Sequence, residues 1–389
     1  EKHPCRCFSY NDSRQPYQSS GPGEGNSVSV EILGMITATP SSEVDQPLGE
    51  AVDAGFVRRF AQAHEDAGFD RVLVGYFSNA AEGAVVSSFV AAATRRLGVL
   101  LAYRPGVIAA PLAARQLATL DQFSEGRLAL NVVSGGNDED LARDGDYLDH
   151  DRRYARTDEY LQALRAIWTA TGPVDFDGEF YRFQGASPAV RPRQSPHIPI
   201  YFSGSSDAAI EVAARHADTY MLWGEPLAAV DGHIRRVRAA AKAQGRDPRF
   251  SVSFRPIVAD TEEAAWKRAA EVLEQVRENR ARLGLPLRDH QPQNVGSQRL
   301  LAAAEQGEVL DSRLWTGVAR LTGARWNSTA LVGTPEQVAA ALGEYYRLGV
   351  STFLIRGFEP LGDAVRYGQG LIPAIHDHIA RLPLLRHAG

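Results

Sequence analysis

Residues 203–207, Ser203-Gly204-Ser205-Ser206-Asp207, have the types and spacing that a phosphate-binding turn requires. They follow the apolar run 198–202 and precede a helical pattern that starts at Ala208. Free backbone N–H groups at a helix start, together with hydroxyl side chains, are what a phosphate binds. An ordinary helix N-cap explains the same residues, since Ser and Asp are favoured there. Gly204, Ser205 and Ser206 are therefore candidate phosphate ligands, with capping as the alternative.

Four other side chains lie where short apolar strands are expected to end. Arg356 follows the last apolar run, and we expect it to face an active site or to form a salt bridge at the rim. Arg255 lies within an apolar strand, so its burial requires a partner, either a structural ion pair or a substrate. Trp223 closes another strand and is expected to stack on a cofactor or substrate, with core packing as the alternative. Asn79, after the second strand, is a candidate for substrate contact.

These side chains must be positioned by alternating strands and helices. Apolar strands are expected at residues 30–36, 71–75, 97–102, 128–133, 198–202, 219–222, 250–258 and 352–355. Helical patterns separate them, at residues 56–67, 85–93, 111–120, 154–169 and 228–244. Apolar strands that alternate with helices predict a parallel sheet covered on both faces. About eight such units favour a TIM (β/α)8 barrel, whose ligands bind at the carboxyl ends of the strands.

The chain is expected to form one barrel domain over residues 28–382. Residues 1–27 are polar, rich in Gly, Pro and Ser, and lack periodicity, so we expect a disordered arm there. Residues 383–389 form a short tail. The long segment 259–329 interrupts the strand–helix rhythm before the last barrel unit. Long inserts at this end of a barrel are usually lids or oligomer contacts, so we expect part of it to cover the substrate.

Composition narrows the possible functions. The chain has 389 residues, 44% hydrophobic and 23% charged, which is typical of a soluble globular protein. Its net charge of −5 gives no reason to expect nucleic acid or an anionic membrane as a partner, and no apolar run reaches membrane-spanning length. Both cysteines, Cys5 and Cys7, lie in the N-terminal arm, so no disulfide framework, thiolate metal site or cysteine nucleophile is expected. A reducing cytoplasm is the simplest compartment.

Ordered motifs along residues 28–382 resemble the flavin-dependent, luciferase-like monooxygenases, and among them the alkanesulfonate monooxygenase group. The matching stretches are Tyr103-Arg104-Pro105-Gly106, Ala113-Ala114-Arg115-Gln116, Asn131-Val132-Val133-Ser134-Gly135-Gly136, Arg153-Tyr154, Gly204-Ser205-Ser206-Asp207, Trp223-Gly224-Glu225-Pro226 and Thr329-Ala330-Leu331-Val332-Gly333.

The resemblance implies a TIM barrel that binds reduced FMN and uses O2 to oxygenate a small organic molecule. It places the flavin phosphate at Ser205, Ser206 and the Tyr154 hydroxyl. It places Ser134 and Asn137 near the flavin ring or ribityl chain, and Tyr103 as a further lining residue. A reactive flavin needs an apolar, water-free site, and the cofactor performs the oxidation, so no metal is expected.

The resemblance also shows where this chain departs from the alkanesulfonate group. Ser253 and Arg255 stand at the positions of an Arg-x-His pair, and Phe358 at that of a late tyrosine. The lid arginine of the group falls near Ala324, with Arg325 one position on. Arg255, Arg325 and Arg356 could form a replacement anion clamp, because guanidinium groups suit sulfonate and carboxylate alike. Arg325 and Phe358 are therefore expected to contact substrate, which could be an organosulfur compound such as a sulfonate.

Two other functions fit the same resemblance. One is hydride transfer with the deazaflavin F420, and the other is flavin binding without catalysis. For the monooxygenase, a separate NAD(P)H-dependent flavin reductase is the expected source of reduced FMN. The resemblance further implies a homodimer or homotetramer that forms through the helices near the second and third strands.

Overall fold

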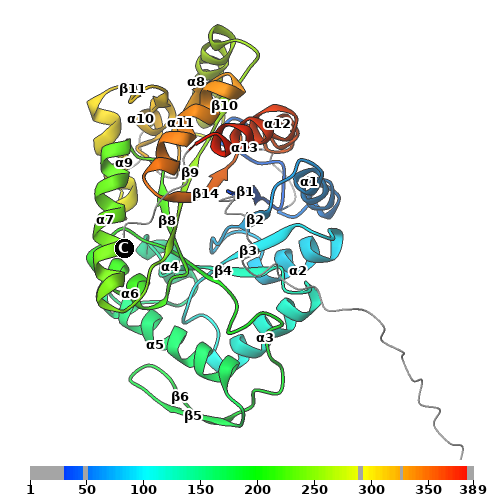
Figure 1. Ribbon diagram of the computed structural model, residues 1–389, viewed down its shortest axis with the longest axis vertical. Helices are drawn as coiled ribbons and strands as arrows, with labels where there is room; N and C mark the ends of the chain where they lie inside the picture. Colours follow the sequence, from blue (N-terminus) through cyan, green and yellow to red (C-terminus); the bar gives the residue numbers. More distant parts are fainter. Residues whose placement is uncertain (1–29, 47–50, 288–291, 325–326, 383–389) are drawn as a thin grey trace, which may run out of the picture.

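The computed structural model describes residues 30–46, 51–287, 292–324 and 327–382. The expected N-terminal arm 1–27, with Cys5 and Cys7, the tail 383–389 and Arg325 lie outside these ranges. Eight parallel strands close into a barrel in the order β1-β14-β9-β8-β7-β4-β3-β2 (Figure 1). The TIM-barrel fold predicted from the alternating pattern is therefore confirmed. The barrel strands are β1 (Glu31–Ile36), β2 (Arg71–Val74), β3 (Gly98–Tyr103), β4 (Leu128–Val133), β7 (Ile200–Ser203), β8 (Thr219–Trp223), β9 (Arg249–Phe254) and β14 (Val350–Ile355).

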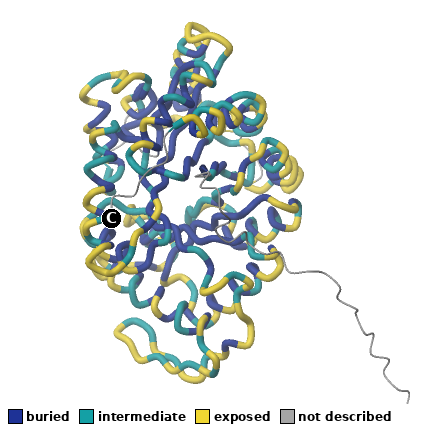
Figure 2. Tube along the Cα trace, viewed as in Figure 1, coloured by how far each residue is buried: buried dark blue, intermediate teal, exposed yellow. Residues whose placement is uncertain are grey.

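Helices surround the barrel and bury one face against it. Their contacts with the outer faces of the strands form the largest apolar cluster of the molecule. Figure 2 shows the strands buried and the outer faces of the helices exposed. These helices are α1 (Ala54–Asp66), α2 (Gly83–Ala93), α3 (Ala110–Phe123), α4 (Asp138–Arg143), α5 (His150–Thr169), α6 (Asp207–His216), α7 (Leu227–Ala243), α11 (Pro335–Arg347), α12 (Pro360–Arg366), the π-helix η1 (Tyr367–Leu371) and α13 (Ile372–Ala380).

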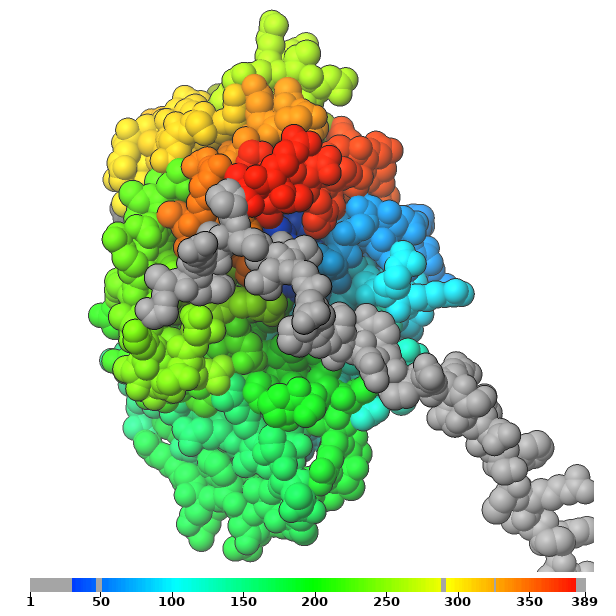
Figure 3. Space-filling model, viewed as in Figure 1, coloured from blue at the N-terminus to red at the C-terminus, as the bar shows by residue number. Residues whose placement is uncertain are grey.

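The segment between β9 and β14 adds a layer of its own. It pairs four short strands in the order β10-β13-β12-β11 and packs its helices beside them. Figure 3 shows this part of the chain, coloured yellow-green to orange, gathered at one end of the molecule. Its elements are β10 (Ile257–Val258), α8 (Glu262–Arg282), α9 (Val295–Gln306), β11 (Val309–Leu310), β12 (Leu314–Trp315), α10 (Gly317–Thr322) and β13 (Ala330–Gly333).

Two details differ from the sequence-based expectation. The run 250–258 is not one strand, because β9 ends at Phe254 and β10 leaves the barrel to pair with β13. Pro256 separates them, and proline lacks the N–H that a central strand donates. The hairpin of β5 (Val174–Asp177) and β6 (Arg182–Ala186), between α5 and β7, was not predicted either.

The amino-terminal end of the barrel interior is closed by a charged network. Glu31 accepts hydrogen bonds from the Tyr201 hydroxyl at 2.7 Å and the Thr352 hydroxyl at 3.1 Å, and pairs with Arg71 at 3.3 Å. Burial alone would raise the pKa of Glu31, but Arg71 and Tyr201 lower it below its usual value. Above this network a small apolar layer, which includes Leu33 and Leu100, fills the interior. The barrel is therefore packed shut at this end, and ligands must enter at the other.

Candidate functional site

The turn from β7 to α6 forms a notch at the carboxyl end of the barrel. Ser206 is the N-cap of α6, and its hydroxyl accepts a hydrogen bond from the Ala209 amide at 3.2 Å. Gly204, Ser205 and Ser206 are each partly exposed, so a ligand can reach them. The first-turn amides of α6 have no partners within the helix, as at every helix start. Ser206 thus performs the capping role, and the notch keeps the donors that an anion needs.

Helix α5 brings Tyr154 to this notch. A Cβ placed on Gly204 would lie 2.9 Å from the Tyr154 hydroxyl oxygen and 2.8 Å from the Ala209 Cβ. Only glycine therefore leaves the notch open at this position, where φ is +155°. Burial raises the pKa of Tyr154 despite its hydrogen bond with Ser206 and the charge of Arg153, so the phenol stays protonated and can donate. Tyr154, Gly204 and Ser206 therefore form a notch whose hydrogen-bond donors suit an anionic group.

The end of β4 meets the same face of α5. The Ser134 hydroxyl lies 2.9 Å from that of Thr157, one helical turn after Tyr154. Because the Thr157 hydroxyl donates to the Arg153 carbonyl, Ser134 must donate to Thr157. Ser134 is buried, and its oxygen remains free to accept a hydrogen bond. The structure thus brings together Ser134, Tyr154 and Ser206 from three separate elements.

Two buried side chains, Tyr220 and His233, hold the backbone of the notch in place. The Tyr220 hydroxyl donates to the Gly204 carbonyl, and His233 Nε2 lies 3.2 Å from the same hydroxyl. Since the tyrosine proton is already used, His233 must donate from Nε2, which leaves its Nδ1 unprotonated. Burial, with the nearby charges of Arg299 and Arg236, lowers the pKa of His233 to about 4. A neutral histidine therefore holds Tyr220, and Tyr220 holds the Gly204 carbonyl.

Trp223 lies at the end of β8, beneath the inserted segment. A Cβ on Gly296, in the first turn of α9, would lie 3.2 Å from its indole ring. Nearby, Arg299 of α9 forms a bidentate pair with Glu225, with distances of 2.8 and 2.6 Å. The start of α9 also reaches the β4 loop, where the Asp138 amide donates to Gln293 at 3.1 Å. Helix α9 is thus fastened over the ends of β4 and β8.

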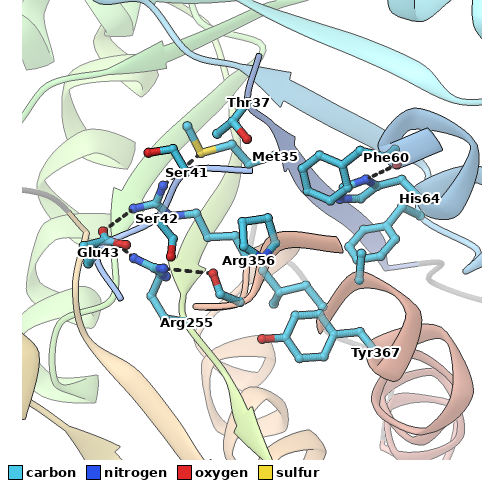
Figure 4. Close-up of a pocket in the computed structure, with 15 residues that line it drawn as sticks. Met35, Thr37, Ser41, Ser42, Glu43, Phe60, His64, Arg255, Arg356 and Tyr367 are labelled. Atoms are coloured by element: carbon cyan, nitrogen blue, oxygen red, sulfur yellow. Dashed lines mark hydrogen bonds and ion pairs between the residues drawn. The ribbon is translucent and has the colours of Figure 1, made fainter. Parts of the chain in front are cut away.

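The two predicted arginines meet at a carboxylate that the sequence did not reveal. Arg255 Nη1 lies 2.6 Å from Glu43 Oε1, and Arg356 Nη2 lies 3.2 Å from the same oxygen (Figure 4). The Arg255 guanidinium also donates to the Gly357 carbonyl at 2.8 Å and lies 3.9 Å above the Phe358 ring. The sequence thus grouped the two arginines, but it indicated neither Glu43 nor the contact of Arg255 with Phe358.

The electrostatics of this cluster follow from its burial. Burial alone would raise the pKa of Glu43, but Arg255 and Arg356 lower it to about 2. Burial and repulsion by Arg255 lower the pKa of Arg356 to about 10. All three groups are therefore charged at neutral pH, and the cluster has a formal charge of +1.

A small cavity adjoins the arginines, between the ends of β1 and β14 and the helices α1 and α12. Its volume is about 30 Å³, enough to admit water. Figure 4 shows Met35, Thr37 and Ser41 on one side of it and His64 and Tyr367 on the other. Burial lowers the pKa of His64 to about 4, although its hydrogen bond to the Phe60 carbonyl opposes this.

The other predicted site residues lie elsewhere. Tyr103 belongs to the layer between barrel and helices, where its hydroxyl is 2.8 Å from that of Tyr160 on α5. Asn137 is exposed and caps α4, accepting from the Asp140 amide at 2.8 Å. Asn79 is exposed in the loop after β2. Their proposed contacts with cofactor or substrate stay predictions.

Three residues that matter to the site were missed from the sequence. Tyr220 and His233 belong to β8 and α7 and lie thirteen residues apart in the sequence. No local pattern links a strand residue to a helix residue at that separation. Glu43 lies in the loop after β1, with no motif around it. The sequence signal for Glu43 was indirect, because a buried arginine at position 255 required an anion from some part of the chain.

Comparison with known proteins identifies the family. Residues 33–352 match the model of the luciferase-like monooxygenase family, so the chain belongs to that family. The EDTA monooxygenase (EmoA) from Chelativorans sp. BNC1 superposes with a TM-score of 0.74 at 18% identity, over 90% of this chain and 94% of that one. Riboflavin lyase (RcaE), solved with modified FMN and riboflavin, superposes with a TM-score of 0.72 at 21% identity, over 90% and 92%.

One neighbour uses a different cofactor. An F420-dependent secondary alcohol dehydrogenase, in complex with an F420–acetone adduct, superposes with a TM-score of 0.63 at 17% identity, over 89% of this chain and 99% of that one. At these identities the likeness establishes the fold and leaves the cofactor open. None of the helices in the described ranges is both long and apolar enough to cross a membrane.

Proposed function

We propose that this protein is a monooxygenase that uses reduced FMN and O2 to oxygenate a small organic substrate. The observation that supports it most is the notch of Gly204 and Ser206, which faces the buried hydroxyl of Tyr154. The notch lies at the carboxyl end of the barrel, where ligands bind in this fold. A phosphate there would receive the amides of the α6 start and the Tyr154 proton.

The other residues of the site position and shield the cofactor. Ser134, held by Thr157, is proposed to contact the ribityl chain, and Trp223 the edge of the ring system. When bound, reduced flavin supplies the electrons that activate dioxygen. The protein excludes water around the bound flavin, because the Arg299–Glu225 pair holds α9 over the carboxyl end of the barrel. Exclusion of water prevents unproductive loss of the activated oxygen.

The reduced cofactor is proposed to come from a separate NAD(P)H-dependent flavin reductase. Neither a GxGxxG turn nor a GxxxxGK[ST] loop ends a strand in this sequence, which favours supply from outside. The assembly is proposed to be a homodimer or homotetramer through α2 and α3. Val85, Leu112 and Phe123 of these helices are 68%, 49% and 81% exposed, and apolar surface of this kind favours an interface.

Hydride transfer with F420 is the second candidate, favoured by the F420-dependent neighbour. Both cofactors carry phosphate, so the notch alone does not separate them. The pure protein should be titrated with reduced FMN, riboflavin and reduced F420 under anaerobic conditions, following cofactor fluorescence. Tight binding of FMN, weaker binding of riboflavin and weak binding of F420 are expected. Preference for F420 would overturn the monooxygenase proposal in favour of the dehydrogenase.

Oxygenation itself needs a second measurement. The protein, FMN, NADH and a flavin reductase should be incubated with sulfides, sulfones, sulfonates and amines, and products identified by mass spectrometry with ¹⁸O2. Incorporation of one labelled atom into a substrate is the expected result. Consumption of O2 with only hydrogen peroxide formed across all substrate classes would contradict it.

A further inference from the structure

Glu43 occupies a position that a substrate anion would otherwise take. It reaches the mouth of the barrel from the loop after β1, and its Oε1 accepts from both Arg255 and Arg356. Two guanidinium groups that converge on one oxygen are the arrangement expected for binding a carboxylate or sulfonate. Here the chain supplies the carboxylate itself.

Contacts with the inserted segment hold the Glu43 loop in place. Asn279 of α8 donates to the Glu43 carbonyl at 3.0 Å, and Arg282 donates to the Gln46 carbonyl at 2.9 Å. Arg282 also lies 3.6 Å from Asp45. The backbone on both sides of the carboxylate is thus anchored to α8, and the Glu43 side chain is delivered to the arginines by a fixed loop.

Each arginine also contacts the protein through its other terminal nitrogen. Arg255 is only 1% exposed, and its Nη2 donates to the Gly357 carbonyl. Arg356 Nη1 contacts the Met35 sulfur at 3.3 Å. The adjoining cavity of about 30 Å³ is lined by all three charged groups. A sulfonate or carboxylate group would have to displace Glu43 Oε1 to accept from both Arg255 Nη1 and Arg356 Nη2.

We infer that Glu43 determines the substrate class of this site: it fills the arginine pair, so the pocket takes substrates whose reacting end is uncharged. The inference rests on the proposed function, since it assigns the substrate of that same pocket. Organosulfur compounds such as sulfides and sulfones remain within this class, and sulfonates fall outside it. The formal charge of +1 that persists does not create an anion site, because the two donors that converge on one point are already bound to Glu43.

Removal of Glu43 should convert the arginine pair into an anion site. Glu43→Ala opens space beside two guanidinium groups, that of Arg255 buried and that of Arg356 partly exposed, which have lost their counter-ion. Methanesulfonate is a suitable probe, and dimethyl sulfone is its neutral counterpart of similar shape. Isothermal titration should show methanesulfonate binding at least about tenfold tighter to Glu43→Ala than to wild type. Dimethyl sulfone binding should change far less.

Three further variants make the result specific. Glu43→Gln keeps the shape and one hydrogen bond, so it should bind methanesulfonate more weakly than Glu43→Ala but above wild type. If Glu43→Ala does not fold, the comparison of methanesulfonate binding by Glu43→Gln and wild type tests the inference. The double variant Glu43→Ala/Arg356→Ala should lose the gained binding. Glu262→Ala is the matched control, because it removes another glutamate–arginine pair, with Arg313, on the surface of α8. It should bind like wild type.

Two results would overturn the inference. One is wild-type binding of methanesulfonate as tight as that of Glu43→Ala. The other is a folded Glu43→Gln variant with no gain over wild type. Neither depends on flavin, so the outcome is separate from the proposed function. If wild type fails to bind reduced FMN while Glu43→Ala gains methanesulfonate binding, the proposed function fails and the assignment of Glu43 as the resident anion stands.

Discussion

Substitution of Gly204 by alanine tests the phosphate notch most directly. The new Cβ would lie 2.8 Å from the Ala209 Cβ and 2.9 Å from the Tyr154 hydroxyl oxygen. Ala209 cannot move away, since its Cβ is fixed to the α6 backbone, so Tyr154 and the turn must shift. A hydrogen bond to a charged group contributes about 1.5–3 kcal/mol, so loss of the Tyr154 contact should weaken FMN binding by about 10- to 150-fold.

Riboflavin supplies the comparison, because it lacks the phosphate. Fluorescence titration of Gly204→Ala should show a large loss of affinity for FMN and a loss of less than about threefold for riboflavin. Gly232→Ala is the matched control, since a Cβ at that position in α7 meets nothing within 4 Å. Equal losses for FMN and riboflavin would show that the notch does not bind the phosphate. Unchanged FMN affinity in a folded Gly204→Ala protein would show the same.

Two other predictions follow from buried groups. Tyr220→Phe removes the hydrogen bond to the Gly204 carbonyl, so FMN affinity should fall about 5- to 10-fold, with riboflavin affinity nearly unchanged; an equal effect on both would make Tyr220 merely structural. Glu43 has a pKa lowered to about 2, so its stabilising contribution is complete above pH 4.5 and is lost as pH falls toward 2. Urea unfolding between these pH values should show wild type losing on the order of 3 kcal/mol more than Glu43→Gln. Parallel pH profiles of the two proteins would contradict the ion-pair assignment.

Much of the fold could be predicted because the barrel strands are buried on both faces. Such strands appear as apolar runs, and each is separated from the next by a helix with its own periodicity. The prediction failed where the local pattern did not carry the information. Residues 250–258 are mostly apolar, yet Pro256 ends one strand, and the last two residues pair with β13. The β5–β6 hairpin has an exposed surface and no apolar run to mark it.

The candidate site likewise contains residues that local sequence identifies and residues that it does not. Ser206 and Gly204 could be found because helix capping and a phosphate turn depend on neighbouring residues in the chain. The Glu43 contact joins residues 212 positions apart, and nothing near Glu43 in the sequence refers to Arg255. The sequence did show that Arg255 needed a partner. It left open whether that partner was a substrate or part of the protein.

The contact with Glu43 changes how an arginine at the carboxyl end of such a barrel should be interpreted. Arg255 and Arg356 alone would suggest a pocket for anions, and their positions at the ends of β9 and β14 would support it. Glu43 reverses the conclusion, because its carboxylate accepts from both guanidinium groups. Since α8 anchors the Glu43 loop, the inserted segment contributes to specificity through that loop. Charge selection in this pocket is thus set by a loop-borne residue as much as by the residues on the strands.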